Sequence, residues 1–193
     1  MKVKIWSAVV LAVGIASTTW GQQSATPKPA VGAPTLTAAM QVIQKELSSL
    51  GKLTYMAYVS NADEKGSSKV IIVYSNVVAD PASCTISYHW WRSMHGTVVN
   101  DEDVSLSLRD AKGVWAMSSV EALHKVSEKE GTLEEERKYG YYERFVPPLY
   151  LVDLRMSNDD EEGFEFANQR QSQRVGKAMT QAVKLCGGTQ EPY

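Results

Sequence analysis

The stretch from Gly163 to Gly188 reads GFEFANQRQSQRVGKAMTQAVKLCGG and predicts a short strand, a turn and a closing helix. Asn168 is suited to cap the first turn of this helix, and Gly187 to end it in the left-handed conformation. Apolar residues recur on one helix face at Val175, Ala178, Met179, Ala182, Val183 and Cys186. We therefore expect an amphipathic helix that closes over a curved sheet formed by the preceding residues.

The chain before this helix changes its hydrophobic period. Residues 35–50 carry an apolar stripe at helical spacing and predict an N-terminal helix. From residue 53 the period is two, which is typical of strands, and turn-forming residues separate the segments. The sequence DAKG at 110–113 is typical of a hairpin turn. The expected fold class is α+β, a curved antiparallel sheet or barrel of about seven strands closed by the C-terminal helix.

The N-terminus has the organisation of a signal peptide over residues 1–21. Two lysines precede an apolar run from Ile5 to Ile15, and small residues lead to Gly21. The run is too short to span a bilayer comfortably, and a retained N-terminal anchor is the alternative reading. Removal of residues 1–21 takes away two of the 20 basic residues and none of the 22 acidic ones, which changes the formal charge from −2 to −4.

Composition divides the remaining chain into three parts. Residues 22–34 are rich in proline, alanine and small polar residues, which is typical of a disordered leader. Residues 35–188 are enough for a single globular domain, and residues 189–193 form a tail. An acidic chain is poorly suited to nonspecific binding of nucleic acid or anionic lipid surfaces. We expect a periplasmic or secreted protein without a membrane span after signal cleavage.

The chain has two cysteines, Cys84 and Cys186. Cys84 lies in phase with the apolar face of a strand, and Cys186 lies in phase with the apolar stripe of the closing helix. Two thiols that point into one core usually pair in an oxidising compartment. A disulfide is therefore predicted, and two buried free thiols are the alternative.

Several motifs resemble those of an uncharacterised family of small exported bacterial proteins. The motifs are SNVVADPASCTISYHW (75–90), DVSLSLRD (103–110), the pair Pro147-Pro148 before an apolar strand, and RVGKAMTQAVKLCGG (174–188). This resemblance implies a fold and export, and it implies no activity. The order of strands followed by a C-terminal helix also resembles a pleckstrin-homology-like barrel, which is a likeness of topology alone.

Residues with catalytic or metal-binding chemistry are scattered. His89 and His95 lie on either side of two tryptophans without the spacing of a metal site, and His124 lies in a charged segment. No nucleophile, nucleotide-binding or phosphate-binding motif occurs. The expectation is no catalytic residue, no metal and no cofactor.

Four aromatic residues have no evident place in a core: Trp91, Tyr139, Tyr141 and Tyr142. Exposed aromatic residues mark partner surfaces, so they are the candidate binding residues, with packing of a loop onto the sheet as the alternative. We expect an exported, non-enzymatic domain that binds an envelope protein, a peptide or a small apolar ligand. An envelope enzyme with an unrecognised site and a purely structural envelope protein are the alternatives.

The signal-peptide assignment predicts a mature N-terminus at Gln22. Intact mass and N-terminal sequencing of the exported protein test this cleavage. Recovery of a chain that still carries residues 1–21 would show a retained anchor instead.

Overall fold

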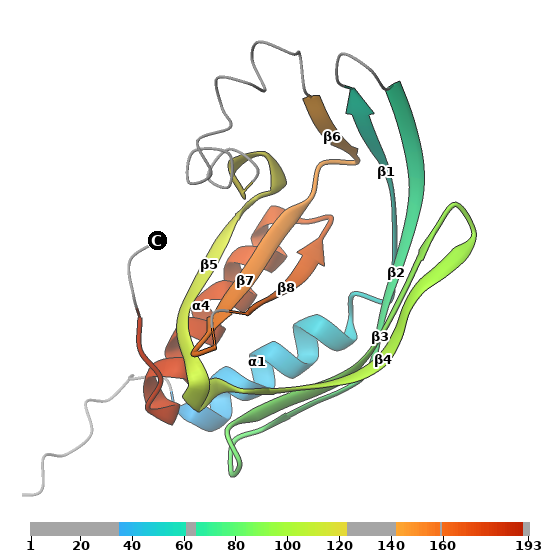
Figure 1. The fold of residues 1–193 in the computed structure, drawn as a ribbon. Coiled ribbons are helices and arrows are strands. Elements are labelled where there is room, and N and C mark those ends of the chain that lie inside the picture. The colour runs from blue at the N-terminus through green and yellow to red at the C-terminus, as the bar shows by residue number, and fades with distance from the viewer. Residues whose placement is uncertain (1–34, 61–64, 123–141, 159, 191–193) are drawn as a thin grey trace, which may run out of the picture. The chain divides into compact units, whose positions relative to one another are not determined.

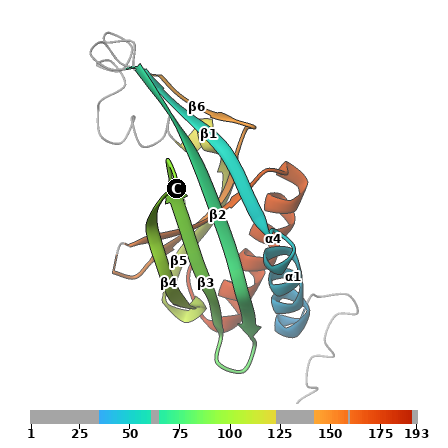
Figure 2. The same ribbon diagram turned by 90° about the vertical axis from the view of Figure 1, so that its right-hand side faces the viewer.

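The computed structural model describes residues 35–60, 65–122, 142–158 and 160–190. Within these residues, eight strands form two antiparallel sheets with helices packed beside them (Figures 1 and 2). In chain order the elements are α1 (Leu36–Ser48), β1 (Lys52–Ser60), β2 (Lys65–Asp80), β3 (Thr85–Met94), β4 (Thr97–Ser107), the 3-10 turn η1 (Leu108–Asp110), β5 (Ala111–Ser118), β6 (Tyr142–Val146), β7 (Tyr150–Met156), β8 (Glu161–Phe166) and α4 (Gln169–Cys186).

The α+β class and both terminal helices are confirmed, whereas the barrel of about seven strands is wrong. The described strands form a five-stranded sheet, ordered β4-β3-β2-β1-β6, and a three-stranded sheet, ordered β5-β7-β8. Neither sheet closes on itself. The signal and leader segments predicted at 1–34 lie outside the described residues.

The hairpin predicted at 110–113 is also wrong, and the reason explains the two sheets. Leu108 is fully buried in η1, and its N–H donates to the Cys84 carbonyl across 2.9 Å. This turns the chain into the core instead of back along β4. Ala111 then opens β5, which pairs with β7.

The five-stranded sheet has one buried face and one outer face. Alternate residues of β2 and β3 are buried, among them Ile72, Tyr74, Ile86 and Tyr88. They share one core with residues of α1 and α4. This buried face is the inner face of the sheet, and the opposite side is called the outer face below.

Both helices begin at a capping side chain, and Asn168 caps α4 as its position predicted. The Thr35 hydroxyl accepts a hydrogen bond from the Ala38 N–H at 3.2 Å, and the Asn168 side chain accepts from the N–H groups of Arg170 and Gln171. Gly187 ends α4 with a φ of 90°, as its position predicted. None of the helices among the described residues combines the length and apolar character needed to cross a membrane.

Helix α4 covers the smaller sheet. Its Gly176 lies so close to β5 that a Cβ there would be 2.7 Å from the Cβ of Ala116. The larger sheet is covered by α1, which packs against both β2 and α4. The sequence predicted that the C-terminal helix alone covers the sheet. In the structure, α4 covers the smaller sheet and α1 covers the larger one.

A group of three aromatic rings joins the two sheets. The Phe164 ring of β8 has its centroid 5.6 Å from that of Tyr74 on β2 and 5.0 Å from that of Tyr88 on β3. The Glu165 N–H donates to the Tyr74 hydroxyl at 3.3 Å. One edge of the smaller sheet therefore rests on the inner face of the larger one.

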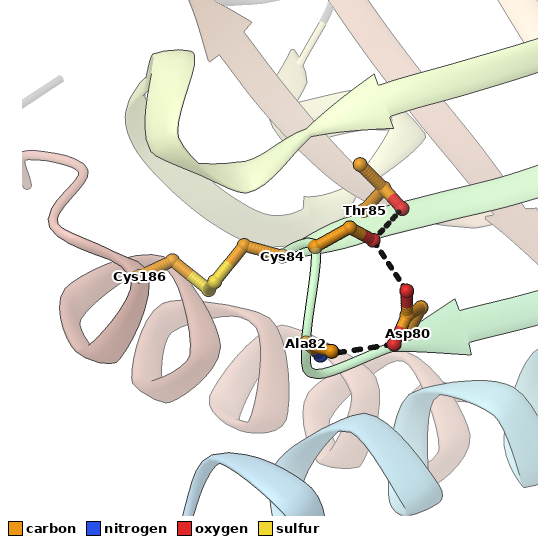
Figure 3. The surroundings of a disulfide bond; sticks show 6 residues. Asp80, Ala82, Cys84, Thr85 and Cys186 are labelled. Carbon is orange, nitrogen blue, oxygen red and sulfur yellow. Dashed lines mark hydrogen bonds between the residues drawn. A yellow bond between two sulfur atoms is a disulfide. The ribbon is translucent and has the colours of Figure 1, made fainter.

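The predicted disulfide between Cys84 and Cys186 is confirmed, with Cα atoms 5.8 Å apart (Figure 3). It links the turn before β3 to the end of α4. Asp80 organises that turn, because its carboxylate accepts hydrogen bonds from the Ala82 N–H at 2.9 Å and the Ser83 hydroxyl at 2.6 Å. Cys84 itself has a positive φ of 60°, which the turn and the disulfide hold in place.

Loss of this disulfide should destabilise the fold, because the bond closes a loop with a sequence separation of 102 residues. We expect the double variant Cys84→Ser, Cys186→Ser to lose about 2–4 kcal/mol, which lowers the melting temperature by about 5–15 °C. Thermal unfolding followed by circular dichroism measures the change. Reductant should lower the wild type to the same temperature and leave the variant unaffected. Equal melting temperatures of the oxidised wild type and the variant would contradict the prediction.

Candidate functional site

The outer face of the five-stranded sheet is the candidate functional site. Figure 2 views this face, with β1, β2, β3 and β4 toward the viewer and the helices beside and behind them. Directly paired residues of antiparallel strands project from the same face, so the register defines rows of side chains across the sheet. The row at its centre consists of Lys52, Val73, Trp91 and Asp101, one from each of β1 to β4.

Apolar side chains cross all five strands on this face. We call them the apolar stripe, and its members are Met56, Ile71, Val73, Trp91, Val98 and Val146. The four inner members are half-buried, whereas Val98 on β4 is 50% exposed and Val146 on β6 is 43% exposed. An apolar stripe of this kind on an outer sheet face is typical of an interaction surface.

A histidine and two carboxylates flank the stripe. His89 of β3 lies 3.1 Å from Asp101 through Nε2 and 3.0 Å from Asp103 through Nδ1. The imidazole therefore bridges two carboxylates of the edge strand β4 and fixes their orientation. Within the described part of the chain, no three His, Cys, Asp or Glu side chains are placed to hold a metal ion.

The four predicted binding residues have different outcomes. Trp91 lies on the outer face, beside Val73 and Asp101 in the central row. Tyr142 is the first residue of β6 and pairs with Ser60 of β1. Tyr139 and Tyr141 lie outside the described residues, as does His124. A binding role for these aromatic residues stays a prediction.

Sequence reasoning missed the aliphatic part of the stripe. Ile71 and Val73 belong to the run VIIVY at 70–74, which is apolar at consecutive positions and so does not mark one face as the outer face. An antiparallel strand with one wet face normally alternates. The continuous run was the available signal, but only the register shows that its Val73 pairs with Trp91.

A second polar cluster lies between the two sheets. The Tyr55 hydroxyl forms hydrogen bonds with the side chains of Glu165 and Arg92. Burial raises the pKa of Glu165, while the Arg92 charge and the Tyr55 hydrogen bond oppose that rise. Burial and the Glu165 charge likewise raise the pKa of Tyr55, so the phenol stays neutral at physiological pH. The cluster fixes how β8 meets the larger sheet.

Asp153 of β7 is the most perturbed carboxylate near this cluster. Burial, with the charges of Glu161 and Glu165, raises its pKa from 3.8 to about 6. Its carboxylate lies over the backbone of Gly163, where a Cβ would be 2.5 Å from the Asp153 Oδ1. The glycine therefore leaves room for this buried acid.

A pocket of about 520 Å³ lies along α1. It is lined by polar residues of α1 and its C-cap, whose stems also expose apolar surface: Gln41, Gln44, Lys45, Ser48 and Ser49. Two of these side chains already serve the fold, because Gln44 accepts from the Ala79 N–H and Ser49 accepts from the Gln171 amide.

Comparison of this chain with protein-family models, with curated proteins and with solved structures finds no match.

Asp153→Asn should stabilise the protein at neutral pH. The unfolded chain ionises Asp153 near pH 3.8 and the folded protein near pH 6, so the charged form destabilises the fold above pH 6. This difference in pKa corresponds to a loss of at most about 3 kcal/mol in the free energy of unfolding. The loss disappears as the pH falls below 3.8, the pKa of Asp153 in the unfolded chain. We expect the variant to gain about 1–3 kcal/mol at pH 7 and almost nothing near pH 3.5, measured by urea unfolding.

Comparing the stability of the wild type and of Asp153→Asn at the two pH values tests the contribution of the Asp153 carboxylate. Burial also raises the pKa values of Glu162 and Glu165, and both proteins share this pH dependence apart from the repulsion between Glu165 and Asp153, which the substitution removes. An equal gain at both pH values would show that packing of the amide, and not ionisation of Asp153, causes the effect.

Proposed function

We propose that this chain is an exported, non-enzymatic binding domain whose apolar stripe docks a protein partner. The observation that carries the proposal is the stripe itself, which crosses the outer face from Val98 on one edge strand to Val146 on the other. Burial of such a surface against a partner supplies a favourable free energy of about 25 cal/mol per Å². Export is part of the proposal, and the disulfide and the N-terminal sequence support it.

Features of the surface favour a protein or peptide over a small apolar ligand. The stripe lies on a convex face (Figure 1), whereas small ligands are usually held in concave apolar sites. The inner face is filled by core residues, including the Tyr74, Tyr88 and Phe164 rings. The pocket along α1 is lined by one helix and its cap, and two of its side chains are engaged in hydrogen bonds of the fold. A flat partner surface with its own apolar patch fits the stripe better.

Trp91 is the expected anchor of this contact. It is the largest side chain of the stripe and lies in the middle of the central row. Aromatic residues at the centre of an interface often contribute more than about 2 kcal/mol to binding. The carboxylates on β4 are suited to the polar rim of such an interface.

Replacement of Trp91 with serine should therefore reduce partner capture by about tenfold or more. Immobilised wild type and Trp91→Ser are challenged with envelope extract, and the bound proteins are quantified by mass spectrometry. The matched control is Val42→Ser, which changes a 38% exposed apolar residue of α1 away from the outer face. Val42→Ser should keep a melting temperature close to that of wild type, and Trp91→Ser, which removes a half-buried side chain, should remain folded with a modestly lower one. Equal capture by wild type and Trp91→Ser would remove the stripe as the binding site.

A further inference from the structure

The central row of the outer face is complementary to itself. It runs from the cation Lys52 through the apolar residues Val73 and Trp91 to the anion Asp101. When the row is reversed, each charge meets its opposite and each apolar residue meets the other apolar residue. A surface with this property can pair with an identical surface through a two-fold axis.

We infer that the partner of the apolar stripe is a second copy of this chain, bound through the outer face. The two-fold axis would lie in the plane of the interface, parallel to the strands and between β2 and β3. This operation places Lys52 of one protomer against Asp101 of the other, and Val73 against Trp91. Each interface then contains two identical ion pairs around an apolar centre, which is the usual arrangement of an apolar core and a polar rim.

The two charged residues are placed to serve such a contact. Lys52 and Asp101 are both exposed, and the Asp101 side chain is 59% exposed. The His89 imidazole lies 3.1 Å from Asp101 Oδ1, which orients the carboxylate without burying it. The half-buried residues Val73 and Trp91 lie between these two charged residues in the same row. The row therefore combines an apolar centre with a charged rim.

The curvature of the sheet sets the strength of this contact. Figure 1 shows that the larger sheet is curved, with its lower end bending away from the outer face and under the helices. Two such faces meet best at their middle, which is the central row. The buried area is therefore modest, and we expect a reversible dimer with a Kd on the order of micromolar.

Charge reversal tests the two-fold arrangement directly. The purified protein is studied by analytical ultracentrifugation over a range of concentrations, together with the variants Lys52→Glu and Asp101→Lys. Each single reversal places like charges at both ion pairs, so each should raise the dimer Kd by about tenfold or more. An equimolar mixture of the two variants restores both pairs in a heterodimer, because Glu at 52 then faces Lys at 101. The mixture should dimerise with nearly the wild-type Kd.

The remaining outcomes separate this inference from the proposed function on which it rests. A protein that stays monomeric at every concentration, or a dimer that survives either reversal, overturns the second-copy inference. Pairing through the edge of β4 would survive Lys52→Glu, because Lys52 lies on β1, away from that edge. A monomer that still captures another protein in a Trp91-dependent way keeps the proposed function and identifies a different partner. A mixture that fails to restore the dimer also overturns the inference.

Discussion

Contact between the three rings of Tyr74, Tyr88 and Phe164 is the interaction on which the rest of this structure depends. Phe164 belongs to the smaller sheet and the two tyrosines to the larger one, so their packing makes one core from two sheets. Aromatic pairs at these separations add to the stability gained from burial. Both helices lie against the same core, and the disulfide attaches the end of α4 to the turn before β3.

The junction has a polar side that limits how the two sheets can be arranged. Tyr55, Arg92 and Glu165 are charged or strongly polar groups next to the core, and their pairing offsets part of the free energy lost on burial. Asp153 lacks such compensation, because the neighbouring charges Glu161 and Glu165 are also negative. The fold therefore carries a buried acid whose ionisation works against its stability.

Among the described residues, the same arrangement leaves the outer face free of helices. Because α1 and α4 both pack on the inner side, the alternate residues of β1 to β4 face away from the helices. The apolar stripe lies on that face, together with His89 and the carboxylates of Asp101 and Asp103. One sheet thickness separates them from the core. Binding there would require no rearrangement of the core, which suits a rigid docking surface.

The sequence alone indicated the two terminal helices and the strand-rich middle from local spacing, and it indicated the disulfide because each cysteine lies in phase with an apolar face. Asn168 and Gly187 mark the ends of α4, and Cys84 and Cys186 each follow an apolar periodicity. Local sequence patterns could not show which strands pair with each other. Burial of Leu108 turned the chain after β4 into a second sheet, where the sequence DAKG had predicted a hairpin. Trp91 was recognisable as a candidate, but its row with Lys52, Val73 and Asp101 joins residues far apart in the chain. Only the register of the folded sheet, set by long-range hydrogen bonds and core packing, brings those four side chains together.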